Sequence, residues 1–341
     1  MKEVPRQQPD TGAALRQEVS AAFDAGERFV LFTHVDPDFD CVGSELALAE
    51  ALGSRGKQVW LWSPSPLPES YRFLPGAERI ATEYPAGVSF DVAVALDTAS
   101  LSRVGEAPAF ARSDFPSLVN IDHHESNERF GTINWVDAGA SSVGEMLYGL
   151  FEAWGVEVTR EIAVCLYASI VTDTGGFSFA NTTARALRVA ASLVECGAEP
   201  FALWRHLFGS WPARRQRLLG QALGTLCLWR DGRIATMRVT QEMLAENGAV
   251  MEDTERFVQY PRTVHGVEVA AILREQTGGR SVRVGLRSNT PAVHVGRIAA
   301  GLGGGGHPSA AGCTVEGGLD EVERTIVTAI GRALDGTGGG A

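Results

Sequence analysis

The chain has 341 residues, of which 45% are hydrophobic and 21% are charged. This composition is typical of a folded globular protein and excludes a largely disordered chain, and the length suits two domains. The 30 Lys and Arg residues against 41 Asp and Glu residues give a formal net charge of −11. A broad basic surface that stably binds duplex DNA is therefore excluded, whereas a small anionic substrate in a local pocket is not.

The cysteines and the apolar runs exclude further classes of protein. An odd number of scattered cysteines without a C-x-x-C pair excludes a disulfide framework or a structural zinc site. No run approaches the roughly 20 apolar residues that span a bilayer, and residues Met1 to Asp10 lack the apolar stretch of a signal peptide. We therefore expect a cytoplasmic protein with no membrane partner. The five cysteines are Cys41, Cys165, Cys196, Cys227 and Cys313.

In the first half of the chain, apolar runs alternate with helical patterns. The runs Arg28–Val35, Gln58–Trp62, Asp91–Leu96 and Ser117–Ile121 are typical of buried strands, and Val42–Leu52 has the spacing of a helix. This alternation predicts an α/β fold with a parallel sheet and helices on both of its faces. In such sheets the chemistry gathers at the carboxyl ends of the strands.

The pattern changes in the second half. After predicted helices over 141–154, 160–171 and 183–196, the dipeptide Asp231-Gly232 indicates a hairpin over 226–239. A second strand pair is predicted over 267–274 and 280–287, followed by a helix from Pro291 to Leu302 and a closing helix over 319–334. We therefore predict a catalytic domain over 1–190, a helical linker over 191–215 and a smaller α+β domain over 216–341.

Four groups of His and Asp residues each stand at the end of a predicted strand or helix. Because three of them follow strands of one parallel sheet, we expect them to meet at a single crevice. A lone Asp at a strand end is usually a cap or a turn former, but four such sites in order favour a functional centre. The groups are His34, Asp38 and Asp40; Asp97; Asp122, His123 and His124; and Asp173.

The types of side chain in these groups indicate which metal ions they would bind. Carboxylates and imidazoles without a thiolate suit Mn²⁺, and also Mg²⁺ or Co²⁺. Two such ions about 3.5–4 Å apart can polarise a phosphoryl group and ionise a water molecule. Cys41 lies beside these ligands in the sequence, where we expect it to pack as a small side chain.

A glycine run in the second domain is the other candidate for chemistry. Residues 301–306 match G-x-G-x-x-G, but a helical pattern precedes them, so a dinucleotide-binding fingerprint is not supported. Glycines followed by His307 and Ser309 favour a structured loop whose N–H groups can approach an anion. Arg287 ends a predicted strand just before this region, and Arg262 and His265 are further candidates for the same site.

These motifs together carry a family resemblance. H-x-x-x-D-x-D at 34–40, Asp97, the D-H-H at 122–124 and T-D-T-G at 172–175 resemble the DHH phosphoesterase superfamily, and Gly304, Gly305, Gly306 and His307 resemble the GGGH motif of its DHHA1 domain. At this length the chain is most similar to NrnA-type oligoribonucleases and PAP phosphatases, and less so to RecJ exonucleases or family II pyrophosphatases.

The resemblance implies a role for each residue of the motifs. One metal would be held by His34, Asp38 and Asp97, and a second by Asp40, Asp97, His123 and Asp173. Asp122 would orient a histidine, and His124 would face the scissile phosphate, so these two residues are the expected catalytic pair. Substrate would be bound by Arg287, Arg262, Gly304, Gly305, Gly306, His307 and Ser309. The first motif departs from the commoner family form at Asp36, Phe39 and Cys41, none of them an expected ligand.

The activity that the resemblance implies is a two-metal, Mn²⁺-dependent phosphodiesterase in a cleft between the two domains. It would use an activated hydroxide to cleave RNA of two to five nucleotides, including pApA, to mononucleotides, and would dephosphorylate 3′-phosphoadenosine 5′-phosphate (pAp). A homodimer is compatible with this family. The alternatives are a cyclic di-AMP phosphodiesterase, a RecJ-like exonuclease for short single-stranded DNA, or a nucleotide-binding regulator. A regulator is expected to lack metal carboxylates, and all of them are present here.

Overall fold

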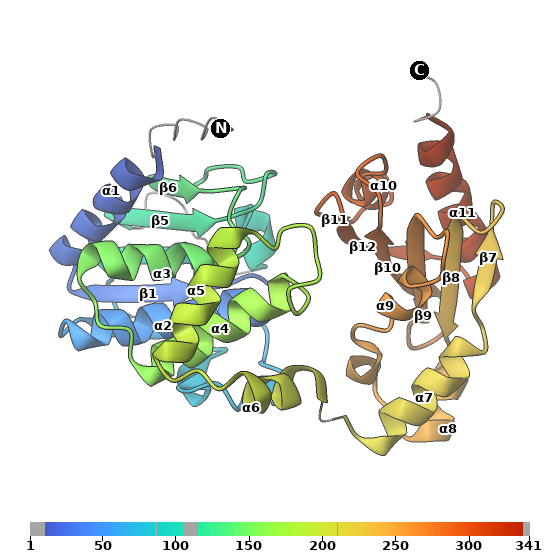
Figure 1. Cartoon of the computed structure of the whole chain (residues 1–341), viewed down its shortest axis with the longest axis horizontal. Helices are drawn as coiled ribbons and strands as arrows, with labels where there is room; N and C mark the ends of the chain where they lie inside the picture. Colours follow the sequence, from blue (N-terminus) through green and yellow to red (C-terminus); the bar gives the residue numbers. More distant parts are fainter. Residues whose placement is uncertain (1–10, 86, 106–114, 210, 337–341) are drawn as a thin grey trace, which may run out of the picture. The chain divides into compact units, whose positions relative to one another are not determined.

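The computed structural model describes residues 11–85, 87–105, 115–209 and 211–336. The chain divides into two compact units, Met1–Ser210 and Trp211–Ala341, each of which has its own sheet (Figure 1). The expectation that the chain has no signal peptide was based on residues 1–10, which lie outside the described part. None of the helices in that part is long and apolar enough to cross a membrane.

The first unit is built on a six-stranded parallel sheet, which confirms the predicted fold class. Its strand order is β3-β2-β1-β4-β5-β6, so the order reverses between β1 and β4. Two of these strands, β3 and β6, were not expected; both are short and lie at the edges of the sheet. The strands are β1 (Arg28–Phe32), β2 (Gln58–Trp62), β3 (Ile80–Ala81), β4 (Val92–Leu96), β5 (Ser117–Asp122) and β6 (Ile133–Val136).

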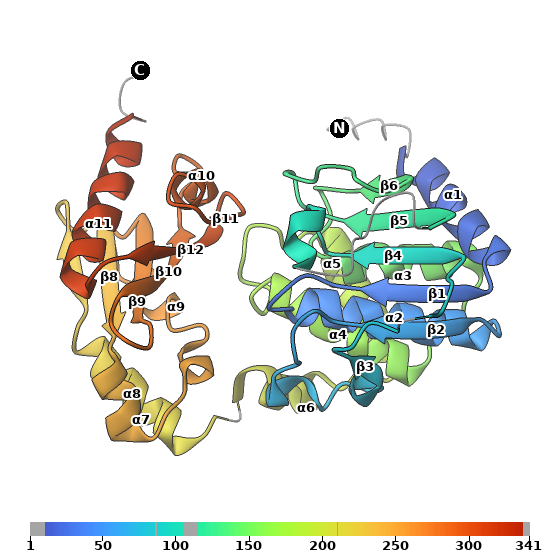
Figure 2. The same ribbon diagram turned by 180° about the vertical axis from the view of Figure 1, so that it is seen from behind.

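Helices cover one face of this sheet. They contribute to a single large core that includes Phe23, Leu48 and Phe151, and in Figure 2 the strands lie in front of most of them. The helices are α1 (Thr11–Ala25), α2 (Phe39–Ser54), α3 (Val143–Trp154), α4 (Arg160–Asp173), α5 (Ala184–Glu195) and α6 (Pro200–Trp204).

The expectation of helices on both faces was wrong. Among the described residues, the opposite face is covered by connecting segments and the 3₁₀ turn Leu101–Val104, which pack Phe90, Val104 and Phe115 against Phe32 and Trp62 of the sheet. Bulky aromatic side chains of these segments bury the sheet where a helix would otherwise do so.

The second unit confirms both predicted strand pairs. Its sheet has the order β11-β12-β10-β9-β8-β7 and is mixed, because β8 and β9 are parallel while the other pairs are antiparallel. The strands are β7 (Cys227–Trp229), β8 (Ile234–Val239), β9 (Val269–Glu275), β10 (Ser281–Ser288), β11 (Gly305–Gly306) and β12 (Ala310–Glu316).

Two layers of helix cover this second sheet. Its α10–α11 face buries Val284, Leu286 and Ile326, whereas its α7–α8 face buries Met237, Ile272 and Phe257. The helices are α7 (Ala213–Leu223), α8 (Gln241–Asn247), α9 (Gln259–Arg262), α10 (Val295–Ala300) and α11 (Leu319–Gly336). The helix expected from Pro291 to Leu302 is shorter than predicted, because it begins after an N-cap at His294, whose Nδ1 accepts a hydrogen bond from the Arg297 N–H at 3.2 Å.

Candidate active site

Three neighbouring strands of the first sheet place the candidate ligands at the same edge of that sheet. His34 follows β1, Asp97 follows β4, and Asp122 ends β5 immediately before His123 and His124. Because β1, β4 and β5 are adjacent and parallel, their carboxyl ends meet at the point where the strand order reverses. That point is the usual ligand site of an open α/β sheet.

Asp97 lies between two groups of possible ligands. Its Oδ2 lies 3.8 Å from His34 Nε2, and its Oδ1 lies 3.5 Å from His123 Nε2. The residue is buried, adopts φ 53°, and leaves Oδ1 without a hydrogen-bond partner within the described residues. A buried carboxylate oxygen without a donor is costly, and a non-glycine residue in this backbone region is unusual. Both features fit a carboxylate that is placed to bind metal ions.

Asp38 and Asp40 are placed by the start of α2. Asp38 is the N-cap residue, and its Oδ1 accepts hydrogen bonds from the N–H groups of Asp40 and Cys41 at 3.0 and 3.2 Å. This cap fixes one carboxylate oxygen of Asp38, and a carboxylate oxygen of Asp38 lies within 4.8 Å of the ligand atoms of His34 and Asp97.

Asp40 is buried at the N-terminus of α3. Its carboxylate accepts hydrogen bonds from the N–H groups of Val143 (2.8 Å) and Gly144 (3.2 Å) and from the Ser169 hydroxyl (2.6 Å). Residue 144 has to be glycine, because a Cβ there would lie 2.1 Å from Ser169 Oγ. The helix terminus favours the ionised carboxylate, so the fold itself orients this ligand.

His34 and His123 both direct Nε2 at the carboxylates. His34 Nδ1 lies 2.8 Å from the Val35 carbonyl oxygen, and His123 Nδ1 lies 3.3 Å from that of Ala140. When Nδ1–H donates to these carbonyls, each Nε2 has a free lone pair, which is the usual arrangement of metal-binding imidazoles. His123 Nε2 also lies 3.6 Å from Asp40 Oδ2 and 3.7 Å from Asp173 Oδ2.

Asp97 is shared by two clusters of candidate ligands, and a third group joins it to Asp122 and His124. Of the two clusters, one contains His34, Asp38, Cys41 and Asp97, and the other contains Asp40, Asp97 and His123, with ligand atoms within 4.8 Å of one another in each. Burial raises the pKa of the Cys41 thiol well above its usual range, and the thiol donates to the Asp38 carbonyl at 3.3 Å. Oxygen and imidazole donors remain, and these suit hard divalent cations.

The pKa values of the clustered side chains also fit a cation site. Burial opposes protonation of His34, but Asp97 and Asp38 outweigh it and raise the pKa of His34 to about 9. Burial and the charge of Asp97 raise the pKa of Asp40 to about 7. Burial likewise raises the pKa of Asp173, which ends α4, where the helix dipole disfavours a negative charge. Bound cations would reverse each of these shifts.

We therefore expect metal binding to release protons. At pH 8 the His34 imidazole is mostly protonated, because its pKa is about 9, and a metal must displace that proton. Metal affinity should rise with pH between 6 and 9, with about one proton or more released per chain at pH 8. Titration calorimetry with Mn²⁺ in two buffers of different ionisation enthalpy measures this number. A heat that is the same in both buffers would contradict the prediction.

Asp122 and His124 form a hydrogen-bonded pair at the end of β5. Asp122 is fully buried, and its Oδ1 accepts from His124 Nδ1 at 2.7 Å and from the His123 N–H at 2.8 Å. Burial of His124 is outweighed by its hydrogen bond to Asp122, which raises the pKa of the imidazole. Asn127 donates to Asp122 Oδ2 and holds the carboxylate in place. His124 Nε2 is therefore oriented by a buried acid.

Three residues of this site were not predicted from the sequence. Ser169 precedes Asp173 by one helical turn on α4, and this spacing was a usable signal. Asn127 has no motif of its own. Arg103 places Nη2 3.2 Å from His34 Nδ1, and its carbonyl accepts from the Val35 N–H at 2.8 Å; nothing in its sequence context distinguishes it from a surface arginine.

The unusual Phe39 of the first motif belongs to the core. Its ring stacks on Tyr71 with centroids 3.9 Å apart and planes 7° apart, and it also contacts Phe73. The side chain packs against the main hydrophobic cluster. Because Phe39 lies between Asp38 and Asp40, its packing anchors these two candidate ligands to the hydrophobic core.

In the second unit, Arg287 and Arg262 lie close together. Arg287 is in β10, and its Nη1 donates to the Leu286 carbonyl at 2.8 Å. Burial and the charges of Arg262 and Arg256 lower the pKa of Arg287 to about 10. Arg262 Nε donates to Asn289 Oδ1 at 2.6 Å. Three guanidinium groups gathered in this way favour an anionic ligand.

The glycine run forms part of the second sheet. Gly305 and Gly306 make β11, which pairs with β12, and His307 and Ser309 lie in the turn between the two strands. A Cβ at Gly304 would lie 2.1 Å from the Gly312 carbonyl oxygen, and the Gly304 N–H donates to Ala299. Close packing against β12 therefore explains why residue 304 is glycine, and the N–H of Gly304 is already hydrogen-bonded within the fold.

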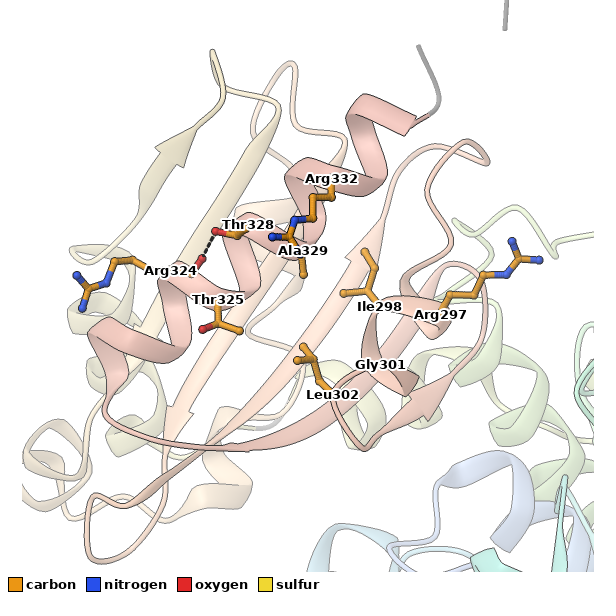
Figure 3. Close-up of a pocket in the computed structure, with 9 residues that line it drawn as sticks. All are labelled: Arg297, Ile298, Gly301, Leu302, Arg324, Thr325, Thr328, Ala329 and Arg332. Carbon is orange, nitrogen blue, oxygen red and sulfur yellow. Dashed lines mark hydrogen bonds between the residues drawn. The ribbon is translucent and has the colours of Figure 1, made fainter. Parts of the chain in front are cut away.

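A hollow of about 590 Å³ lies between α10 and α11 (Figure 3). Arg332 lies beside it, while Arg297 and Arg324 extend away from it in opposite directions. None of the residues that line it carries a carboxylate or an imidazole. It therefore lacks the ligands of the cluster around Asp97.

Comparison with known proteins agrees with this site. Residues 28–170 match the N-terminal domain of the DHH family, and residues 231–340 match the DHHA1 domain. The chain is 38% identical to the bifunctional oligoribonuclease and PAP phosphatase NrnA of Thermus thermophilus, over 90% of each chain. It is 27% identical to the protein of the same name from Bacillus subtilis, over 92% of this chain and 96% of that one.

A solved structure has the same fold. The exopolyphosphatase-related protein of Bacteroides fragilis has a TM-score of 0.88 and is 26% identical, with 96% of this chain and 98% of that chain covered. The two matched domains and the clustered carboxylates and imidazoles define a metal-dependent phosphoesterase. Within that class, the chain belongs to the DHH/DHHA1 family of NrnA-type proteins.

Proposed function

We propose that the protein hydrolyses short oligoribonucleotides to mononucleotides and dephosphorylates pAp. The observation that carries this proposal is Asp97, whose two oxygens face His34 on one side and His123 on the other. The NrnA relatives that span nine-tenths of the chain are named bifunctional oligoribonuclease and PAP phosphatase, which favours these substrates over cyclic di-AMP or short DNA.

The cluster around Asp97 fits two divalent cations. His34, Asp38 and Asp97 would hold one, and Asp40, Asp97, His123 and Asp173 the other. Bound there, Mn²⁺ or a similar ion supplies Lewis acidity at the phosphoryl group and a lowered pKa for a bound water. The four carboxylates carry a charge of −4 against +4 for two such ions, so this centre is close to neutral before substrate binds.

The protein's own side chains then act on the substrate phosphate. Asp122 holds His124 through Nδ1 at 2.7 Å, so that Nε2–H can donate to a phosphoryl oxygen. A donor fixed in advance stabilises the charge that develops in the transition state. We propose that Arg287 and Arg262, with His307 and Ser309, bind a phosphate of the substrate other than the one that is cleaved.

Turnover of a matched substrate panel tests the proposed function. The panel contains pAp, pApA, RNA of two to five nucleotides, cyclic di-AMP and DNA of equal length, each with the Mn²⁺-loaded chain. We expect the highest kcat/KM for RNA of two to five nucleotides, release of inorganic phosphate from pAp, and slow reaction of cyclic di-AMP and DNA. Faster turnover of cyclic di-AMP or DNA than of RNA would overturn it.

Replacing Arg287 by Ala should impair RNA cleavage while the metals stay bound. Loss of a hydrogen bond to a charged group costs about 1.5–3 kcal/mol, or roughly 10- to 150-fold in kcat/KM. A small phosphodiester such as bis-p-nitrophenyl phosphate lacks the second phosphate and should react almost normally. Equal losses on both substrates, with metal content intact, would place Arg287 at the chemical step instead.

A further inference from the structure

The side chain of Asn181 joins two segments of the first unit that carry candidate ligands. Its Nδ2 donates to the Ser141 carbonyl at 3.1 Å and to the Asp173 carbonyl at 3.2 Å, and it lies 3.5 Å from Asp173 Oδ2. Because carbonyl oxygens only accept hydrogen bonds, the amide nitrogen has to face both of them. One amide group therefore connects the end of α4 with the segment before α3.

The contact with Asp173 is made where α4 ends. Asp173 is the last residue of α4, and the last carbonyl groups of a helix have no partner within that helix. Its carboxylate Oδ2 lies 3.7 Å from His123 Nε2. By donating to the Asp173 carbonyl, Asn181 fixes the backbone from which this carboxylate projects.

The contact with Ser141 is made just before the N–H groups that hold Asp40. Val143 and Gly144, two and three residues after Ser141, donate to the Asp40 carboxylate at 2.8 and 3.2 Å. Asn181 therefore ties the end of α4 to the segment that orients Asp40.

This segment is itself anchored by a buried acid. Glu145 Oε2 accepts hydrogen bonds from the Ser141 N–H at 2.9 Å and from the Ser141 hydroxyl at 2.5 Å. Glu145 is buried, and its Oε1 accepts a hydrogen bond from Arg185. The Ser141 carbonyl is thus a fixed point to which Asn181 donates.

The loop between α4 and α5 turns back so that Asn181 reaches Asp173. Gly175 adopts φ 59°, and a Cβ there would lie 2.4 Å from the Phe179 ring. The Thr182 N–H donates to the Phe179 carbonyl at 3.1 Å and closes the turn that contains Asn181. The glycine of the T-D-T-G motif therefore allows this return of the chain.

The other half of the Asn181 amide lacks a hydrogen bond. Its Oδ1 is buried and has no partner within the part of the chain that the structure describes. A buried oxygen without a donor is costly, and an apolar side chain would avoid that cost. The donor half of the amide is therefore what favours asparagine at this position.

We propose that Asn181 is a positioning residue that sets the affinity of the cation site of Asp40, Asp97, His123 and Asp173, because it joins Asp173 to the segment that holds Asp40. The proposal rests on the proposed function, which places a divalent cation at that site. Replacing a residue that holds a metal ligand in place typically lowers metal affinity by about 10- to 100-fold. Asn181 acts through Asp173 and does not have to contact the ion.

Mn²⁺ binding to the full chain, followed by the electron paramagnetic resonance signal of free Mn²⁺, tests this role without relying on turnover. Asn181→Ala should weaken the binding of one of two ions by about 10- to 100-fold and leave the other nearly unchanged. In an Asp173→Asn background the same substitution should add less than about twofold, because the ligand that Asn181 positions is already lost. In an Asp38→Asn background, which disturbs the other site, the full loss should remain.

Asn134→Ala is the matched control. The Asn134 side chain accepts a hydrogen bond from the Gly131 N–H and donates to the Gly131 carbonyl, both at 2.8 Å, and these two bonds involve no candidate ligand. Its loss should lower the melting temperature, as the loss of Asn181 should, but leave both Mn²⁺ affinities unchanged. The comparison separates a loss of stability from a displaced ligand.

Unchanged Mn²⁺ binding in Asn181→Ala, equal losses at both sites, or an undiminished loss in the Asp173→Asn background would overturn the proposal. A loss of Mn²⁺ affinity of the same size in Asn134→Ala would also overturn it. Failure of the proposed function is a separate outcome, seen as a wild-type chain that binds two Mn²⁺ ions but does not cleave short RNA.

Discussion

Replacing Asp97 by Asn should lower the turnover of short RNA by about 10³-fold or more. The Asp97 carboxylate is the one side chain common to both ligand clusters, and several kcal/mol of transition-state stabilisation come from correctly placed cations. Asn offers a single neutral oxygen in place of two charged ones. Metal content per chain, measured by mass spectrometry beside kcat, should fall for both sites together.

Two variants serve as controls for Asp97→Asn. Asp91 lies immediately before β4, whereas Asp97 lies immediately after it. The Asp91 side chain is partly exposed and accepts a hydrogen bond from the Arg28 N–H at 2.8 Å. Asp91→Asn should therefore retain full activity and both metals. Asp40→Asn should mainly disturb one metal, because Asp40 belongs to one cluster. Two metals and normal turnover in Asp97→Asn would refute the bridging role.

Replacing His124 by Ala should lower kcat by about 10²- to 10³-fold, which is the usual effect of removing one donor from a developing charge. His124 is held by Asp122 at 2.7 Å, and it belongs neither to the cluster of His34, Asp38, Cys41 and Asp97 nor to the cluster of Asp40, Asp97 and His123. The loss should be similar for RNA and for bis-p-nitrophenyl phosphate, because both present a phosphoryl oxygen. Steady-state kinetics on the two substrates measures it.

Asp122→Asn is the matched variant for His124. It keeps the shape of the side chain but removes the charge that supports the imidazole, so a loss of about 10- to 100-fold is expected, as for other residues that orient a functional histidine. Metal content should be unchanged in both variants. Loss of a metal in His124→Ala would show that His124 is itself a ligand.

The sequence predicted the strands that carry the site because their apolar runs are continuous. β2 and the core of β1, β4 and β5 lie where expected. The runs of β1 and β4 have no polar interruption because these strands are buried on both faces, and Asn120 is the one polar residue within the predicted run of β5 after Ser117. The parallel topology then placed His34, Asp97 and Asp122 at one sheet edge. The roles of the individual ligands came from family resemblance and stay predictions.

Other features depend on contacts that no local pattern records. Asp40 is oriented by the N–H groups of Val143 and Gly144, a hundred residues later in the chain, and by Ser169. The parallel pairing of β8 with β9 and the aromatic cover of the first sheet likewise arise only when the chain folds.

Anomalous diffraction from crystals of the full chain grown with Mn²⁺ tests the central claim most directly. The account predicts two manganese peaks about 3.5–4 Å apart with the Asp97 carboxylate between them, one beside His34 and Asp38 and the other beside Asp40, His123 and Asp173. A single peak, or peaks that leave Asp97 without contact to a metal, would contradict it.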